Sequence, residues 1–348
     1  MSAGSLAIVV ERDPAGANAL AAPETRARFS RMAEDATPPN TRRAYAADLR
    51  YFNSWFEICG FGEPSLPIAA DILIRFVVDH MEGLDPKVDA ALVAAGVKTK
   101  RGMHRISTVS RRMAAVATWH RSSGFPSPLS GGPVQESLRL ARKAAARRGH
   151  RPRKKKAALR ETVQSLLANK TSPSQADVRD DAMILFAFAS GGRRRSEVVE
   201  ARIENLEEID GEYVYRLGIT KTEQEGSDRA VPVAGKAAVA LRSWLALVGE
   251  AEGPIFRAID RHGNIGRTAL NGRALARIVQ RRAAAAGLDA RIYGGHSLRS
   301  GFITESGRQG KSIFDAMQLS GHKSMQTVAG YHQAGTALAN EAGRLFDL

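Results

Sequence analysis

Apolar side chains recur at intervals of three or four residues in several stretches of the first 150 residues, and this spacing predicts helices over 41–60, 71–81, 101–124 and 134–149. The positions expected to face inward are Tyr45, Leu49, Phe52 and Phe56 in the first stretch, Leu73, Phe76 and Val77 in the second, and Ile106, Val109, Met113 and Val116 in the third. Basic residues fall beside these positions: Arg42, Arg43, Arg50, Arg101, His104, Arg105, Arg111 and Arg112. The pattern therefore predicts an all-helical bundle with basic faces.

The pattern changes in the second half of the chain. An unbroken apolar run, DDAMILFAFASGG, predicts a buried helix, after a shorter helix over 160–169. Two short β-type runs, EYVYRLGIT and RAVPV, flank the polar segment KTEQEGSD and predict a hairpin. Further helices are expected over 236–248, 272–286, 297–308, 312–319 and 324–331, and an amphipathic stretch covers 337–348. The predicted fold class is mainly α with a small β-sheet in the second domain.

A run of nine Lys and Arg residues between Arg142 and Lys156 separates the two patterns. Such a run is either a solvated linker or a clamp on a phosphate backbone, and both interpretations set a domain boundary near residue 150. The expected division is a flexible arm over 1–24, a helical domain over 25–148, a basic linker over 149–159 and a second domain over 160–348.

The charge balance narrows the choice of partner. Lys and Arg exceed Asp and Glu by 51 to 36, so the net charge is +15. A polyanion is therefore the expected partner, with nucleic acid the first candidate and an anionic membrane surface the second. No apolar run is long enough to span a bilayer and no basic segment precedes the first apolar patch, so a cytoplasmic protein is expected. The single cysteine, Cys59, excludes an internal disulfide framework and a thiolate metal cluster.

One segment, Tyr293 to Tyr331, concentrates reactive side chains. His296 and Arg299 lie one helical turn apart, His322 follows the dipeptide Ser-Gly, and Tyr331 lies nine residues after His322. Arg cannot bind a metal ion and a phenol seldom does, so the set does not indicate a metal site. It suits phosphoryl transfer, which needs positive charge on the phosphate oxygens, a group that exchanges protons near neutral pH, and an oxygen nucleophile. The alternative for HSLR alone is a capped helix start with surface histidines.

Five ordered pieces resemble the catalytic domain of the tyrosine recombinases, the phage integrase family: GGRRRSEVVEARIENL, the lysine of GITKTEQEGSDRAVPV, HSLR, LSGH, and the final tyrosine. The helical first domain resembles the core-binding domain of that family, in the compact layout of its Cre-like and Xer-like members. The resemblance selects Arg194, Lys221, His296, Arg299, His322 and Tyr331 as the catalytic set, with Glu197 as an acidic partner. This chain departs from the family's usual leucine before the first catalytic arginine, because Arg193 stands there.

The resemblance also implies a role for each residue. Arg194 and Arg299 would bind the phosphate oxygens, and Tyr331 would attack the phosphorus. His296 would accept the phenol proton and be oriented by Glu197. Lys221 would protonate the leaving oxygen, and His322 would donate a hydrogen bond to the phosphate. A phosphotyrosyl ester conserves the energy of the broken bond, so neither a nucleotide cofactor nor a metal ion is expected.

The expected partner is double-stranded DNA with paired recombination half-sites, bound by a homotetramer whose subunits are weakly associated or monomeric when free. Eight basic residues are candidate DNA contacts: Arg42, Arg43, Arg105, Arg111, Lys154, Lys155, Arg273 and Arg277. The alternative for each is a solvated surface side chain that contacts no DNA. The stretch 337–348 would dock on a neighbouring subunit, or fold back on its own domain. The resemblance thus implies a site-specific DNA recombinase. The two alternative functions are a type IB topoisomerase-like DNA-relaxing enzyme and a DNA-binding protein without catalysis.

Overall fold

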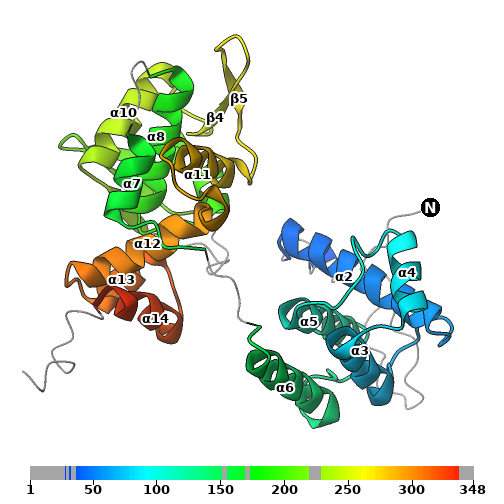
Figure 1. Ribbon diagram of the computed structural model, residues 1–348. Helices are drawn as coiled ribbons and strands as arrows, with labels where there is room; N and C mark the ends of the chain where they lie inside the picture. Colours follow the sequence, from blue (N-terminus) through cyan, green and yellow to red (C-terminus); the bar gives the residue numbers. More distant parts are fainter. Residues whose placement is uncertain are drawn as a thin grey trace, which may run out of the picture. The chain divides into compact units, whose positions relative to one another are not determined.

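The computed structural model describes residues 28, 31–32, 37–150, 155–168, 173–218 and 229–336. Contacts divide the chain into two compact units, Met1–Pro152 and Arg153–Leu348, and each unit is described by itself (Figure 1). The division falls within the basic segment that was expected to be a linker. No helix in the described ranges combines the length and the apolar character needed to cross a membrane.

The described part of the first unit is helical. Apolar and aromatic residues of α2 to α6 form its core, with Phe52, Trp55, Phe76, Leu92 and Met113 fully buried. Helix α3 packs against α6, and α2 packs against α5 (Figure 1). The helices span α2 (Pro39–Ile58), α3 (Ala70–Glu82), α4 (Pro86–Ala94), α5 (Ile106–Ser122) and α6 (Gly132–Arg147).

A buried polar network crosses this core. The Nδ1 atom of His80 lies 2.6 Å from the carbonyl oxygen of Phe76, so Nδ1 carries the proton and Nε2 accepts from the Tyr51 hydroxyl at 2.8 Å. The Nε2 atom of His104 lies 3.1 Å from the same hydroxyl, and the Arg112 guanidinium covers the Tyr51 ring. Burial lowers the pKa of His80 to about 3 and raises the pKa of Tyr51 to about 12. The folded first unit therefore holds its central imidazole neutral.

The second unit is built around α8. The Ser174 side chain caps this helix, and the buried face of α8 packs against α10 and α12 (Figure 1). The helices of the unit are α7 (Arg160–Leu167), α8 (Gln175–Ala189), α9 (Arg195–Val199), η1 (Ile203–Asn205), α10 (Lys236–Val248), α11 (Ala274–Ala285), η2 (Ala290–Ile292), α12 (Gly295–Arg308), α13 (Ile313–Ser320) and α14 (Met325–Thr336).

Two small antiparallel sheets complete the described part of the second unit. The first has the order β1–β2–β3, with β1 (Leu206–Ile209), β2 (Glu212–Arg216) and β3 (Ala230–Val233), and the second pairs β4 (Arg257–Ile259) with β5 (Ile265–Ala269). In β2, Tyr213 and Tyr215 point into the core, while Val231 and Val233 do so in β3. The residues between β2 and β3 include 219–228, which lie outside the described ranges.

The predicted fold class is confirmed: helices dominate and the sheets are small. The expected helix over 236–248 is α10, and the expected pairing of EYVYR with AVPV is that of β2 with β3. The sequence pattern missed α4, α9, the short helices η1 and η2, β1 and the β4–β5 hairpin. The expectation that Arg112 lies on a basic surface was wrong, because this side chain is buried over Tyr51 near Asp48.

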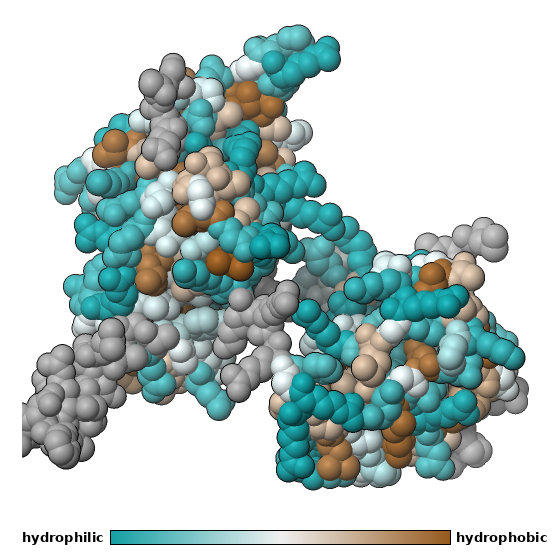
Figure 2. All heavy atoms as spheres, in the orientation of Figure 1, coloured by the Kyte–Doolittle hydropathy of each residue, from teal (hydrophilic) through white to brown (hydrophobic). Residues whose placement is uncertain are grey.

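On the face drawn in Figure 2, apolar residues occur as small separated patches among hydrophilic ones. Exposed apolar side chains in the described ranges include Phe314 on α13 and Met325 at the start of α14.

Candidate active site

A glycine pair brings the first arginine motif close to α12 and α13. Gly191 and Gly192 have φ angles of +95° and +69°, a region that L side chains rarely adopt. A Cβ atom at Gly191 would lie 2.4 Å from the Leu319 carbonyl oxygen, and one at Gly192 would lie 2.6 Å from the Arg299 Cα atom. Only glycine therefore allows this loop to approach both segments.

Arg194 follows the glycine pair and is held by Glu197. The Arg194 Nη1 atom lies 2.6 Å from Glu197 Oε1, and the Arg194 backbone N–H donates to Glu197 Oε2 at 3.1 Å. The side chain of Arg194 keeps partial exposure, so it is oriented but accessible. The Glu197 carboxylate thus orients an arginine, and its expected role toward His296 stays a prediction.

Arg299, on the buried face of α12, links three segments. Its Nη1 atom donates to the Gly192 carbonyl oxygen at 2.8 Å, and its Nη2 atom lies 3.1 Å from His322 Nδ1. Burial, together with the positive charges of Arg194 and Arg193, lowers the pKa of Arg299 to about 9. The guanidinium therefore remains protonated at neutral pH, at a high electrostatic cost that a bound anion would offset.

The contacts of His322 define its tautomer. Arg299 can only donate, so Nδ1 of His322 must accept, and the proton of the neutral ring is assigned to Nε2. The Ser320 hydroxyl lies 2.7 Å from the same Nδ1 atom. Burial, and then the charge of Arg299, lower the pKa of His322 to about 4. At neutral pH this ring is an uncharged N–H donor, which suits hydrogen bonding to a phosphate oxygen.

His296 and Tyr331 are neighbours although α12 and α14 are separated in sequence. Their ring centroids lie 6.4 Å apart with an angle of 70° between the planes. The two helices can pack this closely because Gly307 has no side chain: a Cβ atom there would lie 2.4 Å from the His332 carbonyl oxygen. An imidazole beside a phenol is the arrangement that general-base activation of the phenol requires.

A surface pocket of about 330 Å³ adjoins these residues. Its lining is dominated by positive or hydrogen-bonding side chains, which suits a phosphate group. The residues that line it are Lys155, Arg193, Arg194, Arg195, Ala276, Gln280, Gly294, Gly295, His296 and Arg299. Lys155, a predicted DNA contact, lines this pocket, and its Nζ atom donates to the Arg291 carbonyl oxygen. Its contact with DNA stays a prediction.

Two predicted residues fall outside the described ranges. Lys221 belongs to the segment between β2 and β3, and Lys154 immediately precedes Lys155. The other members of the predicted catalytic set lie in the second unit, at the start of α9, on α12, after α13 and on α14.

The candidate DNA contacts differ in their surroundings. In the second unit, Arg277 is exposed on α11 and Arg273 is exposed at the N-cap of that helix. In the first unit Arg105 is exposed, Arg42 is half-buried and Arg43 donates to Asn40 at 2.8 Å. Arg111 forms an ion pair of 2.8 Å with Asp48 while keeping an exposed surface. These positions are compatible with DNA contact but do not single out base-reading residues.

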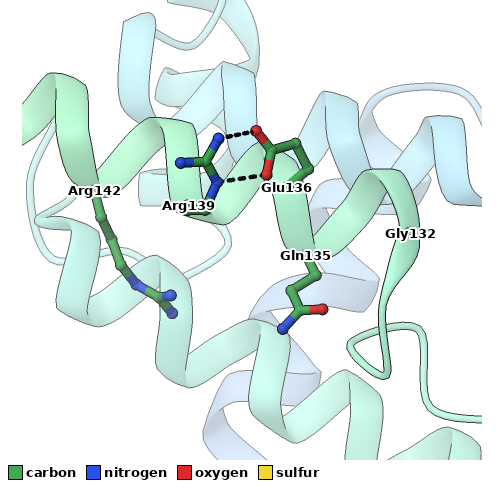
Figure 3. A pocket seen from close by; sticks show the side chains of 5 residues that line it. All are labelled: Gly132, Gln135, Glu136, Arg139 and Arg142. Carbon is green, nitrogen blue, oxygen red and sulfur yellow. Dashed lines mark hydrogen bonds and ion pairs between the residues drawn. The ribbon is translucent and has the colours of Figure 1, made fainter.

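Helix α6 shows how charge on the first unit is partly neutralised. A surface hollow of about 400 Å³ is lined by Gly132, Gln135, Glu136, Arg139 and Arg142. The Arg139 guanidinium is joined to the Glu136 carboxylate by two contacts (Figure 3). The Arg142 guanidinium instead donates to the Ser110 hydroxyl of α5 at 3.2 Å. Arg139 therefore adds less net positive charge to this face than its sequence position indicates.

Three contributors to the site were not apparent from the sequence. They are Arg193, Ser320 and the close approach at Gly192. The Gly-Gly doublet before three arginines was the available signal, because such a doublet favours a tight turn with positive φ.

The chain is similar to known integrases and recombinases. A model of the phage integrase family matches residues 158–337, more than half of the chain. An integrase/recombinase XerD homolog from Selenomonas ruminantium is 29% identical over 324 residues, covering 90% of this chain and 87% of that protein.

Solved structures share the fold. The XerH site-specific recombinase, bound to a palindromic difH substrate in a post-cleavage complex, matches with a TM-score of 0.58 and 17% identity, covering 93% of this chain and 84% of that one. The Tn1549 transposon integrase, in complex with transposon right end DNA, matches with a TM-score of 0.59 and 11% identity, covering 91% and 98%.

Proposed function

The chain belongs to the phage integrase family, the tyrosine recombinases, and on that premise we propose how its own residues carry out site-specific DNA recombination. The protein is an enzyme that cleaves and rejoins DNA. The observation that supports the assignment of residues is that Arg194, His296 and Arg299 line one pocket. Arg299 also contacts His322, and the His296 ring lies beside that of Tyr331. The topoisomerase and non-catalytic alternatives are not favoured, because the similar proteins are recombinases and integrases.

In the proposed reaction, the Tyr331 hydroxyl oxygen attacks the scissile phosphorus and forms a 3′-phosphotyrosyl bond. The phenol proton passes to His296, whose ring is adjacent to that of Tyr331. The bond from phosphorus to the 5′ oxygen breaks, and Lys221 supplies the proton that this oxygen needs. Attack by the 5′ hydroxyl of another strand then reverses the chemistry and gives a Holliday junction.

Arg194 and Arg299 are proposed to bind the non-bridging oxygens. Their guanidiniums offer paired N–H donors, and the charge on these oxygens grows as the phosphorus becomes five-coordinate. Glu197 orients Arg194, and the neutral His322 donates from Nε2 to the same phosphate. The low pKa of His322 supports a role as hydrogen-bond donor rather than proton shuttle at neutral pH.

DNA binding is the partner interaction supported by the family and by the net charge of +15. We assign helix-borne arginines of the first unit and Arg273 and Arg277 of α11 to duplex contacts, and Lys154 and Lys155 to the phosphate backbone. The proposed substrate is a pair of half-sites bound by four subunits in the cytoplasm, with weak association between subunits in the absence of DNA.

The function is tested by recovering the target site and then measuring strand exchange. Full-length protein is incubated with fragmented source DNA, covalent complexes are isolated under denaturing conditions, and the attached DNA is sequenced. A plasmid carrying two copies of the recovered site should yield excision or inversion products. Supercoil relaxation without exchange of flanking sequence would contradict recombination, and binding without covalent capture would contradict catalysis.

The assembly proposal has its own test. Residues 337–348, which lie outside the described ranges, are proposed to dock on a neighbouring subunit. Removal of residues 335–348 should preserve binding to one half-site and abolish cooperative assembly of paired sites, measured by native gel shift. A truncated protein that still assembles and recombines at normal rates would contradict docking between subunits, and a truncated protein that unfolds would favour packing of the tail on its own domain.

A further inference from the structure

Arg193 is a buried cation in the loop that carries the first catalytic arginine. Only 2% of its surface is exposed. An apolar side chain would avoid the desolvation of a charge. A buried arginine therefore needs contacts that offset the desolvation of its charge, and these contacts show which segments it joins.

We propose that Arg193 is a positioning residue that fixes the end of α13, and with it His322, against the arginine motif. Its Nη2 atom donates to the carbonyl oxygen of Leu319, and its Nη1 atom lies 3.7 Å from Glu197 Oε2. The proposal rests on the proposed function, because it assigns Arg193 to the active site described above.

The contact with Leu319 acts at a helix end. Helix α13 ends at Ser320, and the last carbonyl groups of a helix have no partner within the helix. A guanidinium there satisfies one of these carbonyls and interacts favourably with the negative end of the helix dipole. The chain then continues through Ser320 and Gly321 to His322, so Arg193 holds the start of the segment that presents the imidazole.

A second arginine, Arg299, connects the same loop to the residues after α13. Arg299, from α12, donates to the carbonyl oxygen of Gly192, the residue immediately before Arg193, and also contacts His322. Arg193 and Arg299 thus tie the loop, α12 and the end of α13 to one another. Loss of either brace should let His322 move relative to the guanidiniums that bind phosphate.

Arg193 also adds fixed positive charge to the pocket. Burial lowers its pKa to about 10, so it remains protonated at neutral pH. Its charge contributes to the low pKa of His322, in addition to burial and the charges of other neighbours. Among the residues that the structure describes, the charged or titratable groups near His322 include Arg299 and His296 on α12, Arg194 and Arg193 in the motif before α9, and Arg229 before β3, whose guanidinium lies beside Gly321.

The test is a titration of His322 in the full-length protein by NMR, with labelled histidine and a His322→Gln variant for assignment. Wild-type protein should titrate near a pKa of about 4, which burial and the cationic neighbours impose on this ring. Arg193→Leu and Arg193→Met remove both the charge and the brace, so the midpoint should move upward toward the ordinary value of 6.5. Arg193→Lys keeps the charge and a donor, and its midpoint should stay close to that of the wild type.

Arg257→Met is the matched control. Arg257 is also 2% exposed in the second unit, and it donates to Glu250 and to the carbonyl oxygens of Glu252 and Pro254, away from the residues that line the pocket. Its loss should lower stability while leaving the His322 midpoint unchanged. If Arg193→Leu and Arg193→Met also leave the midpoint unchanged, Arg193 is structural only and the proposal is overturned.

A second measurement covers the reaction. On DNA recovered by covalent capture, Arg193→Leu should form the adduct roughly 10²-fold more slowly, as expected for a displacement of about 1 Å in an active site. Arg193→Lys should recover most of the rate, and Arg257→Met should retain it in the folded fraction. Equal rates for Arg193→Leu and the wild type would also overturn the proposal. The titration needs no DNA, so an inactive wild-type enzyme would refute the proposed function without deciding the role of Arg193.

Discussion

Replacement of Gly307 by alanine tests whether the close packing of α12 and α14 sets the position of the nucleophile. The new Cβ atom would lie 2.4 Å from the His332 carbonyl oxygen, so α14 must move by about 1 Å to reach an ordinary contact distance. Alanine is favoured over glycine within a helix by about 1 kcal/mol, whereas overpacking costs about 1–3 kcal/mol. The net change should be a loss of up to about 2 kcal/mol, with Tyr331 displaced from His296.

Gly330→Ala is the matched control, because Gly330 lies in α14 beside Tyr331 and a Cβ atom there meets nothing within 4 Å. This variant should gain about 1 kcal/mol from helix propensity. Hydrogen exchange of α14 peptides, read by mass spectrometry, should therefore change in opposite directions for the two variants. Adduct formation should slow about 10²-fold in Gly307→Ala only. Similar protection and similar rates in both variants would refute the claim that Gly307 positions the nucleophile.

Three further outcomes follow from the structure. Gly192→Ala should destabilise the protein and slow adduct formation far more than Gly249→Ala does. Both glycines have φ between +65° and +69°, but only at Gly192 would a Cβ atom meet another backbone segment within 4 Å. Equal effects of the two variants in urea unfolding and covalent capture would contradict this. His80 stays neutral in the folded first unit, because its pKa there is about 3 and not the ordinary 6.5. Acid therefore protonates His80 more readily in the unfolded chain, so the free energy of unfolding is highest above pH 6.5 and is lower by about 3 kcal/mol at pH 4. His80→Gln should flatten this dependence in urea titrations, and an unchanged slope would remove His80 as its cause. Replacing residues 154–156 by glutamine should reduce the slope of log affinity against log salt by up to about 2.7 without changing the preferred DNA sequence, and a lost preference would mean that these lysines read bases.

The helices were predictable where apolar spacing was regular. Phe52, Phe76 and Met113 occupy the core positions that the pattern assigned to them. The missed elements are those whose sequence carries a weak period: β1 contains the acidic pair Glu207–Glu208, and α4 is a short helix begun by the Asp85 cap. Their formation depends on strand pairing and on capping, which apolar spacing alone does not reveal.

The sequence predicted the type of reaction at the site, but not the contacts and burial of each side chain. The spacing of His296, Arg299, His322 and Tyr331 indicated phosphoryl transfer, and their clustering in the second unit supports that interpretation. The tautomer of His322 was not predictable, because it depends on which donor faces Nδ1 after folding. The burial of Arg193 was equally hidden, since a triple arginine indicates surface charge until the contact with Leu319 is seen.

The most direct test of the account is the chemical identity of the bond between protein and DNA. Wild-type protein, incubated with a nicked duplex that carries the recovered target site, is denatured and digested, and the DNA-linked peptide is identified by mass spectrometry. The account predicts a 3′ phosphate esterified to Tyr331, and no adduct with Tyr331→Phe. A denaturation-resistant adduct that persists in Tyr331→Phe, or a link through a 5′ phosphate, would contradict it.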